Sequence, residues 1–580
     1  MQTRSGAAHL TVLGARSLLA VCALAGAAGV AGASPPAEAP ADIDPVMGAM
    51  AAELERTTTS LALPGYEAPY YTAYRVEDLV GHSIGGRMGA VDEDRVQHSR
   101  DAWVDVRVGG YDFDSSEDDM AEWPYEDDYE PPTSVPIDGD AAGLRHTLWL
   151  LTDLRYKQAL SSYMKLKGQR VFTPDKKKKR PSNTRAEAVH YTEAPVALSV
   201  DAERWRRTVK TLGNMVATAP AVFDNQVLFR ARVQTRWFVT NEGIRLRTVA
   251  PLYEIHVQAW VRTDDGMLLD QSVDLYGRSE SRLPDDAELE RQVSQMLADL
   301  EALRLAPELE PYTGPAILEP AATGVFFHEV LGHRLEGHRQ DSAEEGQTFA
   351  DHLGQQIMPS FLSVLDDPTR ATEGSVQLNG AYRFDDEGVR AQEVTLVRDG
   401  VLEGFLMSRR PVSGFDRGNG HGRAQGTMTP VSRMGNLIVR SDRTVSDARL
   451  RKMLLAEARR QGKPYALIIR DITGGSTNTS SYGYQAFKGG ARMVYKVDAR
   501  TGAETLVRGV EIVGTPLTAL GKIMAAGDTP GVFNGYCGAE SGMVPVSTIA
   551  PATLFSEIEL QRSARGRAKG PILGSPGGNP

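Results

Sequence analysis

An apolar segment in the middle of the chain ends in two histidines five positions apart. Residues 324–327 run directly into His328 and Glu329, and His333 follows. Two neutral imidazoles can hold a divalent metal, and a glutamate beside one of them can take a proton from metal-bound water. On an ideal helix, side chains five positions apart point about 140° apart, so both histidines reach one metal only if the helix widens or ends between them. Gly332 lies where either change would occur.

The alternative is a half-buried helix that carries histidines by chance. The chain has 11 histidines in 580 residues, and a chance match to this pattern is expected about 0.01 times. Because the spacing differs from the usual His-Glu-x-x-His arrangement, the pattern alone does not decide between the two interpretations. The lone cysteine described below favours the metal site.

The length of the chain predicts more than one domain. A chain of 580 residues is long enough for two or three hydrophobic cores. Pro311 and Pro315 follow a predicted helix and suggest a boundary near residue 308. We therefore expect an α+β fold, in which a mixed α/β domain at residues 42–308 precedes a β-rich domain at residues 309–580. The metal-binding helix lies at the start of the second domain.

The periodicity of apolar residues predicts the main elements of both domains. Helical spacing indicates helices at 44–61, 141–167, 201–216, 285–305 and 446–461. Alternating patterns indicate strands at 71–76, 83–91, 102–108, within 226–276, and at 465–470, 493–497 and 504–508. An Asp-Gly pair within 395–406 predicts a hairpin turn.

The N-terminus has the features of a bacterial secretory signal. Arg4 and Arg16 precede an apolar stretch at residues 17–30, and residues 31–33 have the small-x-small form of a cleavage site. We therefore expect residues 1–33 to be a signal peptide that is cleaved near Ala33, and the mature protein to be periplasmic or secreted. A lipoprotein site at Cys22 is less favoured because apolar residues continue beyond it. No other segment reaches the roughly 18 apolar residues of a membrane span.

Removal of the signal leaves a single thiol, Cys537. In an oxidising compartment this cysteine cannot form an internal disulfide. A lone exported thiol is buried, paired with another chain, or protected by a metal.

Charge and glycine patterns exclude other classes of function. The net charge of −11 argues against nucleic-acid binding, which requires a basic surface. We interpret the acidic stretch at 112–132 and the basic run at 176–180 as solvated loops. Residues 474–477 are glycine-rich, but no Lys-Ser/Thr pair follows, so we expect a turn and not a phosphate-binding loop.

A series of short motifs runs through the second half of the chain. In chain order the motifs are His328-Glu329-Val330-Leu331-Gly332-His333, Leu335-Glu336-Gly337, Asp385-Asp386-Glu387-Gly388-Val389, Asp399-Gly400-Val401-Leu402-Glu403-Gly404, Asn419-Gly420-His421-Gly422-Arg423, Pro430-Val431-Ser432-Arg433-Met434, Tyr536-Cys537-Gly538, Val544-Pro545-Val546-Ser547 and Ala550-Pro551. Together these motifs resemble the TldD/PmbA family of bacterial zinc metallopeptidases. Their order and spacing agree with the family from about residue 311 to 559. Over residues 42–308 the resemblance rests mainly on position.

The resemblance implies a Zn²⁺ site made by His328, His333 and Cys537, with Glu329 as the general base. A thiolate would complete three protein ligands and leave a fourth position for water, as a catalytic zinc requires. The family more often has an acidic residue where this chain has His338. We favour a role for His338 outside the ligand set, with ligation as the alternative.

The resemblance also implies a TldD-like, catalytic peptidase that acts on peptides or unfolded polypeptide segments. Substrate would lie as an extended strand against a sheet edge. The protein would form a homodimer, or a heterodimer with a TldD/PmbA paralogue. Family members are typically cytoplasmic, so the export signal is a departure.

Two other functions remain open at this point. The chain could be a non-catalytic peptide-binding or partner subunit with a structural metal, or a metal-dependent hydrolase that acts on another bond. His421, Arg423 and Tyr482 are polar residues in glycine-rich surroundings that could stabilise a carbonyl or carboxylate. We interpret them as ordinary loop residues.

Overall fold

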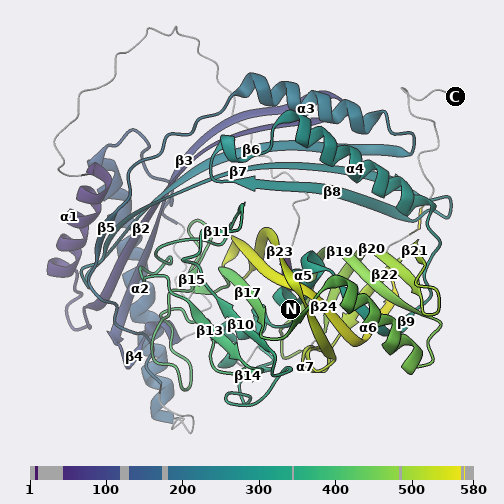
Figure 1. Ribbon diagram of the computed structural model, residues 1–580. Helices are drawn as coiled ribbons and strands as arrows, with labels where there is room; N and C mark the ends of the chain where they lie inside the picture. Colours follow the sequence, from purple (N-terminus) through teal and green to yellow (C-terminus); the bar gives the residue numbers. More distant parts are fainter. Residues whose placement is uncertain are drawn as a thin grey trace.

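Two β-sheets from different halves of the chain dominate the fold (Figure 1). The computed structural model describes residues 7–10, 44–117, 130–172, 180–342, 345–482, 486–563 and 567–568. Seven strands between residues 69 and 277 form the first sheet, and the larger sheet draws almost all of its strands from residues 312–562. The expected α+β class is confirmed.

Long antiparallel strands build the first sheet, in the order β4-β3-β2-β6-β7-β5 with β8 beside β7. The strands are β2 (Pro69–Arg87), β3 (Ala90–Gly110), β4 (Phe113–Asp114), β5 (His190–Thr192), β6 (Val222–Thr240), β7 (Arg245–Arg262) and β8 (Leu268–Gly277). The prediction of a single strand at 83–91 is wrong. Met88 and Gly89 have φ values of 49° and 77°, so a tight hairpin turn divides this segment between β2 and β3.

Within the described residues, four helices cover the outer face of this sheet. They are α1 (Pro45–Ser60), α2 (Ala141–Phe172), α3 (Ala202–Ala217) and α4 (Asp286–Leu305), and they agree with the predicted ranges. Side chains of Asp44, Asp201 and Asp285 accept hydrogen bonds from the first turns of α1, α3 and α4. Alternate residues of β6 pack under α3 and α4, where Trp205 stacks on Phe229 with a ring-centroid distance of 4.0 Å.

The inner face of the same sheet is polar and basic. Neighbouring side chains of a strand point to opposite faces, so Arg230, Arg232 and Arg236 of β6 lie on the face opposite Phe229. Figure 1 shows this curved sheet arching over the C-terminal half, with α3 and α4 on its convex side. The basic face is thereby turned toward the second sheet.

The second sheet is thirteen-stranded and folds back on itself through β24. Its strands are β1 (Ala7–Leu10), β9 (Tyr312–Leu318), β10 (Leu362–Asp366), β13 (Val394–Arg398), β14 (Val401–Leu402), β17 (Asn436–Ser441), β18 (Thr444–Val445), β19 (Tyr465–Asn478), β20 (Phe487–Asp498), β21 (Glu504–Val507), β22 (Val510–Gly514), β23 (Ile523–Ala539) and β24 (Gly542–Arg562). Because β24 pairs with β9, β17, β22 and β23, the sheet curls around the buried helix α5 (Pro320–Val330).

Smaller elements complete the C-terminal half. They are α6 (Asp447–Arg460), α7 (Pro516–Leu520), the strand pairs β11 (Thr372–Glu373) with β12 (Val376–Gln377) and β15 (Gly422–Arg423) with β16 (Val431–Ser432), and 3₁₀ turns η1 (Ser115–Glu117), η2 (Glu280–Arg282), η3 (Gly332–Leu335) and η4 (Gly337–Gln340). The predicted Asp-Gly turn joins β13 to β14, with φ values of 49° at Asp399 and 82° at Gly400. The turn expected at residues 474–477 is wrong, because these residues belong to β19.

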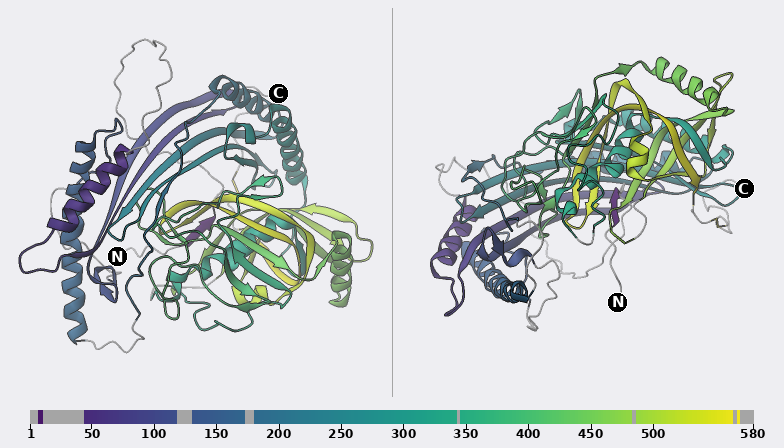
Figure 2. Two further views of the ribbon diagram at one scale, coloured as in Figure 1. Left: turned by 60° about the vertical axis from the view of Figure 1, so that its left-hand side comes forward. Right: turned by 90° about the horizontal axis from the view of Figure 1, so that it is seen from below.

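A short N-terminal strand lies between two strands of the C-terminal half. Ala7–Leu10 pairs antiparallel with β19 on one side and with β23 on the other, and Leu10 lies opposite Cys537. Figure 2 shows this strand in purple beside the yellow strands. The rest of the predicted signal peptide lies outside the described residues, as do 118–129 of the acidic stretch and 176–179 of the basic run. Within the described residues, no helix combines the length and apolar character needed to cross a membrane.

Candidate metal centre

Helix α5 carries the His-Glu pair into the core of the C-terminal half. Pro320 occupies its first turn, where a missing N–H costs nothing, and every residue from Ala322 to Val330 is buried. A helix that is apolar on all sides must be enclosed by other elements. The curled sheet provides this enclosure, so His328 and Glu329 are placed away from solvent.

The predicted interruption between the two histidines is confirmed as a helix end. α5 stops at Val330, and the 3₁₀ turn η3 begins at Gly332. A Cβ on Gly332 would lie 2.1 Å from Sδ of Met434, so a side chain at this position would force Met434 to move. The tighter turn brings His333 back toward His328, with ring centroids 4.9 Å apart and ring planes at 87°.

Cys537 of β23 joins these histidines in one cluster. One ligand atom from each of His328, His333 and Cys537 lies within 4.8 Å of the other two. The Sγ of Cys537 is 3.4 Å from Nε2 of His333, and all three residues are fully buried. Two imidazoles and a thiolate are the donor set that suits zinc and related transition metals.

Unpaired polar atoms at the centre also fit a bound cation. Both ring nitrogens of His328 and both carboxylate oxygens of Glu329 are buried without a hydrogen-bond partner among the described residues. Each unsatisfied buried group costs about 1–3 kcal/mol. A divalent metal among His328, His333 and Cys537 would give the imidazole a partner and would put a positive charge beside Glu329.

Local charges favour the thiolate form of Cys537 and the protonated form of His333. Burial alone would raise the pKa of the Cys537 thiol, but His333 and Arg433 hold that pKa far below its usual range. Burial would lower the pKa of His333, yet the charges of Cys537 and Glu336 raise it to about 10. In the metal-free chain the two groups therefore form a thiolate–imidazolium pair. Metal binding would release the imidazole proton.

Glu336 and Arg433 contact two of the candidate ligands, His333 and Cys537. Oε2 of Glu336 lies 3.3 Å from Nδ1 of His333, which directs Nε2 toward Cys537. Arg339 donates to the same carboxylate at 2.8 Å. Burial would raise the pKa of Glu336, but His333 and Arg339 outweigh it and lower the pKa to about 2. Arg433 donates to the backbone oxygen of Cys537 at 2.6 Å and lies 3.4 Å from Glu336.

The carboxylate of Glu329 occupies space left by a glycine of β19. A Cβ on Gly475 would lie 2.2 Å from Cγ of Glu329. Burial raises the pKa of Glu329 to about 7, although His333 and His328 oppose the shift. Arg334 donates to the backbone oxygens of Glu329 at 2.7 Å and Asn478 at 3.1 Å, which ties the turn after α5 to β19.

The other candidate residues lie apart from this cluster. His338 pairs with Glu540. His421 is buried between Asp366 at 3.2 Å and Asn419 at 3.1 Å. Tyr482 is 78 % exposed, and Arg423 donates to the backbone oxygen of Met434 at 2.6 Å.

Sequence reasoning assigned no role to Glu336, Arg433 or Gly475. Glu336 is three positions after His333, a spacing at which a carboxylate can reach the other ring nitrogen. No local pattern indicates the roles of Arg433 and Gly475, since both depend on contacts with distant segments.

Comparison with known proteins identifies the C-terminal half. Residues 311–562 match the family model of the PmbA/TldA metallopeptidase C-terminal domain. A metalloprotease of Archaeoglobus fulgidus is 31% identical over 255 residues, which cover 43% of this chain and 54% of that protein. The zinc metalloprotease TldD homolog of Saccharolobus solfataricus is 27% identical over 275 residues, which cover 46% of this chain and 57% of that protein. The chain thus spans about half the length of the curated relatives it matches.

Similarity to solved structures extends over most of the fold. TldE from Thermococcus kodakarensis superposes with a TM-score of 0.58 at 13% identity, covering 88% of this chain and all (100%) of that one. At this identity the match concerns the fold alone. The family model and the metalloprotease relatives show that the C-terminal half, residues 311–562, is similar to the PmbA/TldA metallopeptidase C-terminal domain.

Proposed function

We propose that the protein is a zinc-dependent peptidase that hydrolyses peptides or unfolded polypeptide segments. One observation carries the proposal. The donor atoms of His328, His333 and Cys537 lie within 4.8 Å of one another, and the unpaired carboxylate of Glu329 is adjacent to the first of them. Three protein ligands leave a coordination position open, as catalytic zinc sites do.

In this proposal, three residues bind the metal and a fourth transfers protons. His328, His333 and Cys537 would hold the metal, which when bound supplies Lewis-acid activation of water and of the scissile carbonyl. Glu329 takes a proton from the attacking water at its carboxylate and returns it to the leaving nitrogen. A raised pKa suits this exchange, because a carboxyl with a pKa of about 7 can both accept and donate a proton near neutral pH. Burial of the site limits competing water.

The neighbouring strands support an extended peptide as substrate. β19 and β23 accommodate the backbone of Ala7–Leu10 between them, and its last residue lies opposite Cys537. Backbone pairing of this kind binds a strand with little dependence on its sequence. A substrate strand in the same place would pass directly beside the metal ligands.

We further propose a dimeric assembly and export. The similarity of the fold to TldE supports a paralogous partner, with a homodimer as the other arrangement. The sequence of residues 1–33 supports secretion with cleavage near Ala33.

The test combines zinc analysis with peptide-library cleavage. The protein should bind about one zinc per chain. Glu329→Gln should keep the zinc and lower turnover by about 100- to 10,000-fold. Glu403→Gln is a matched control, because Glu403 is a surface carboxylate that pairs with Arg398. Zinc and peptide binding without cleavage by the wild type would instead support a non-catalytic partner subunit, and full activity of Glu329→Gln would exclude its role as base.

A further inference from the structure

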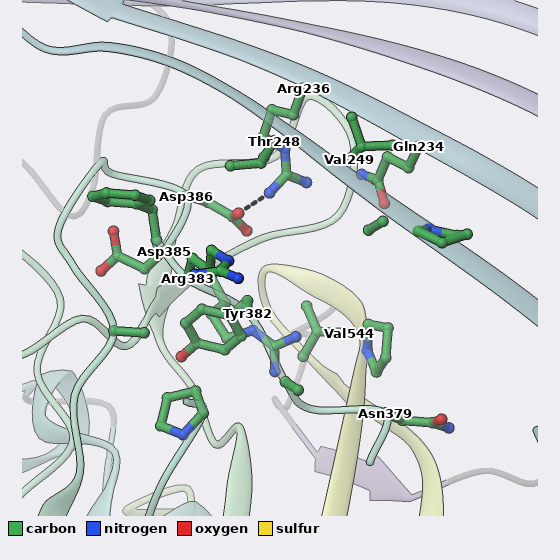
Figure 3. Close-up of a pocket in the computed structure, with 18 of the residues that line it drawn as sticks. Gln234, Arg236, Thr248, Val249, Asn379, Tyr382, Arg383, Asp385, Asp386 and Val544 are labelled. Carbon is green, nitrogen blue, oxygen red and sulfur yellow. Dashed lines mark ion pairs between the residues drawn. The ribbon is translucent and has the colours of Figure 1, made fainter. Parts of the chain in front are cut away.

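A cavity of about 960 Å³ lies between the inner face of the first sheet and the C-terminal half. Figure 3 shows Gln234, Arg236, Thr248 and Val249 of β6 and β7 on one wall, facing the loop that carries Asn379, Tyr382, Arg383, Asp385 and Asp386. Val544 of β24 contributes from below. The cavity is large enough for a peptide of several residues.

This cavity is separate from the metal centre. Tyr536 of β23 lines it, whereas the next residue, Cys537, lies with α5 in the core of the C-terminal half. Adjacent residues of a strand face opposite sides. The β23–β24 hairpin therefore stands between the cavity and the metal ligands.

Arginines dominate the charge of the cavity. Among the residues that the structure describes, seven arginines line it, against four carboxylate residues, Glu77, Glu193, Asp385 and Asp386. The seven are Arg230, Arg232, Arg236, Arg278, Arg383, Arg390 and Arg423.

Some of these arginines already have acidic partners. Arg236 pairs with Glu77 at 2.9 Å and also with Asp386, as Figure 3 shows. Arg230 lies 2.7 Å from Glu254. These pairs need no ligand.

Three other arginines form no ion pair among the described residues. Arg232 donates to the phenol oxygen of Tyr536 at 2.8 Å, and Arg423 donates to a backbone oxygen. Among the described residues, the guanidinium of Arg278 donates to backbone oxygens, including that of Asn379 at 2.9 Å. Burial and the nearby charge of Arg423 lower the pKa of Arg278 to about 10, so these cations share one poorly solvated space. Burial would lower the pKa of Arg232, but Tyr536, Glu254 and Glu77 raise it above its usual value, whereas burial lowers the pKa of Arg423 as it does that of Arg278. A buried charge without a counter-charge is unfavourable, and an anionic ligand would offset the charges of Arg278 and Arg423.

We propose that this cavity binds an acidic peptide segment, with its carboxylates at Arg278 and Arg423. The planar guanidinium group of arginine can donate two parallel hydrogen bonds to one carboxylate. The inference rests on the proposed function only in taking the ligand to be a peptide. The cavity would then hold an acidic part of a substrate or partner outside the metal centre.

Fluorescence anisotropy tests the proposal on the full-length Glu329→Gln protein, which should not consume the probe. The probes are a labelled decapeptide of alternating Glu and Ala and its Gln–Ala counterpart. We expect the acidic peptide to bind at least about tenfold more tightly, because several charge-assisted hydrogen bonds are lost with glutamine. Excess inorganic phosphate serves as the competitor.

Two variants at positions that tolerate change locate the binding. Ala250→Trp fills the cavity from an exposed position of β7, and Arg390→Glu reverses an exposed charge at its rim. Each should weaken binding of the acidic peptide at least about tenfold. Arg398→Gln, a surface arginine outside the cavity, should leave the affinity unchanged.

The outcomes separate this inference from the proposed peptidase activity. The inference would be overturned if the two peptides bound with equal affinity. It would also be overturned if Ala250→Trp and Arg390→Glu left the affinity for the acidic peptide unchanged. Tight phosphate binding without peptide binding would assign the arginines to a small anion and would also overturn it. Cleavage of a neutral peptide by the wild-type protein tests the peptidase separately and does not depend on this cavity.

Discussion

Gly475 of β19 and Glu329 of α5 are packed so closely that a Cβ on the glycine would lie 2.2 Å from Cγ of the glutamate. The glycine thus makes room for the carboxylate that we propose as the general base. This relationship also explains why residues 474–477, whose glycines predict a turn, form part of a strand. β19 needs glycine where it passes the metal centre, and its backbone continues in extended form.

Gly475→Ala should leave zinc binding largely intact and lower peptide turnover by about 100-fold or more, because the new methyl group must displace Glu329. Zinc content and kcat should be measured together. Gly489→Ala is the matched control, since Gly489 pairs with Gly475 on β20 and its Cβ would approach no atom closer than 3.3 Å. Equal activity of the two variants would show that the close packing does not constrain Glu329.

Glu336→Gln should weaken zinc binding by about 10- to 100-fold, because the carboxylate orients His333 and a neutral amide supports its ring less well. Competition with a chelator of known affinity measures the change. Glu345→Gln removes another carboxylate that pairs with Arg339, at 2.6 Å, but does not contact His333. Its zinc affinity should match that of the wild type, and an equal loss in both variants would assign the effect to Arg339 instead.

His256 and Asp274 should make stability depend on pH. They are cross-strand neighbours on β7 and β8, with Nδ1 2.6 Å from Oδ1. Burial alone would lower the pKa of His256, but Asp274 outweighs it and raises the pKa above the ordinary 6.5. Because the folded-state pKa is the higher one, the stabilisation is fully present below about pH 6.5 and is lost as the pH rises through the folded-state pKa.

His256→Gln should therefore lower the free energy of unfolding by about 1–2 kcal/mol at pH 5 and by less at pH 9. Urea denaturation at the two pH values measures both differences. Asp274→Asn, which removes the charged partner of His256, should likewise lower the free energy of unfolding more at pH 5 than at pH 9. A loss that is equal at both pH values would mean that the imidazole is neutral in the folded protein.

Removal of residues 1–33 should increase the apparent affinity for peptide substrates. The full-length chain places Ala7–Leu10 between β19 and β23, where we propose that substrate binds. A tethered segment competes at an effective concentration of about millimolar. The truncated protein should thus have a lower KM and an unchanged kcat. Identical KM values would show that the N-terminal strand does not compete with substrate.

Local patterns were sufficient for the helices and for the first part of the metal centre. Apolar spacing and the capping residues Asp44, Asp201 and Asp285 act within a few positions, so the helix ranges agree with the structure. The helix end after His328 was foreseeable for the same reason, because spacing and Gly332 are both local. The joining of Cys537 to the histidines followed only from the family resemblance.

The sequence by itself determined the elements whose stability comes from nearby residues, together with the residue types that can bind a metal. The tertiary structure decided what depends on distant segments. It placed Cys537 beside His333, Arg433 against the backbone of Cys537, and Gly475 against Glu329. It also turned the basic face of β6 toward a cavity. These contacts join segments 100 to 200 positions apart, and their energies arise from packing, burial and charge that exist only once the two sheets are assembled.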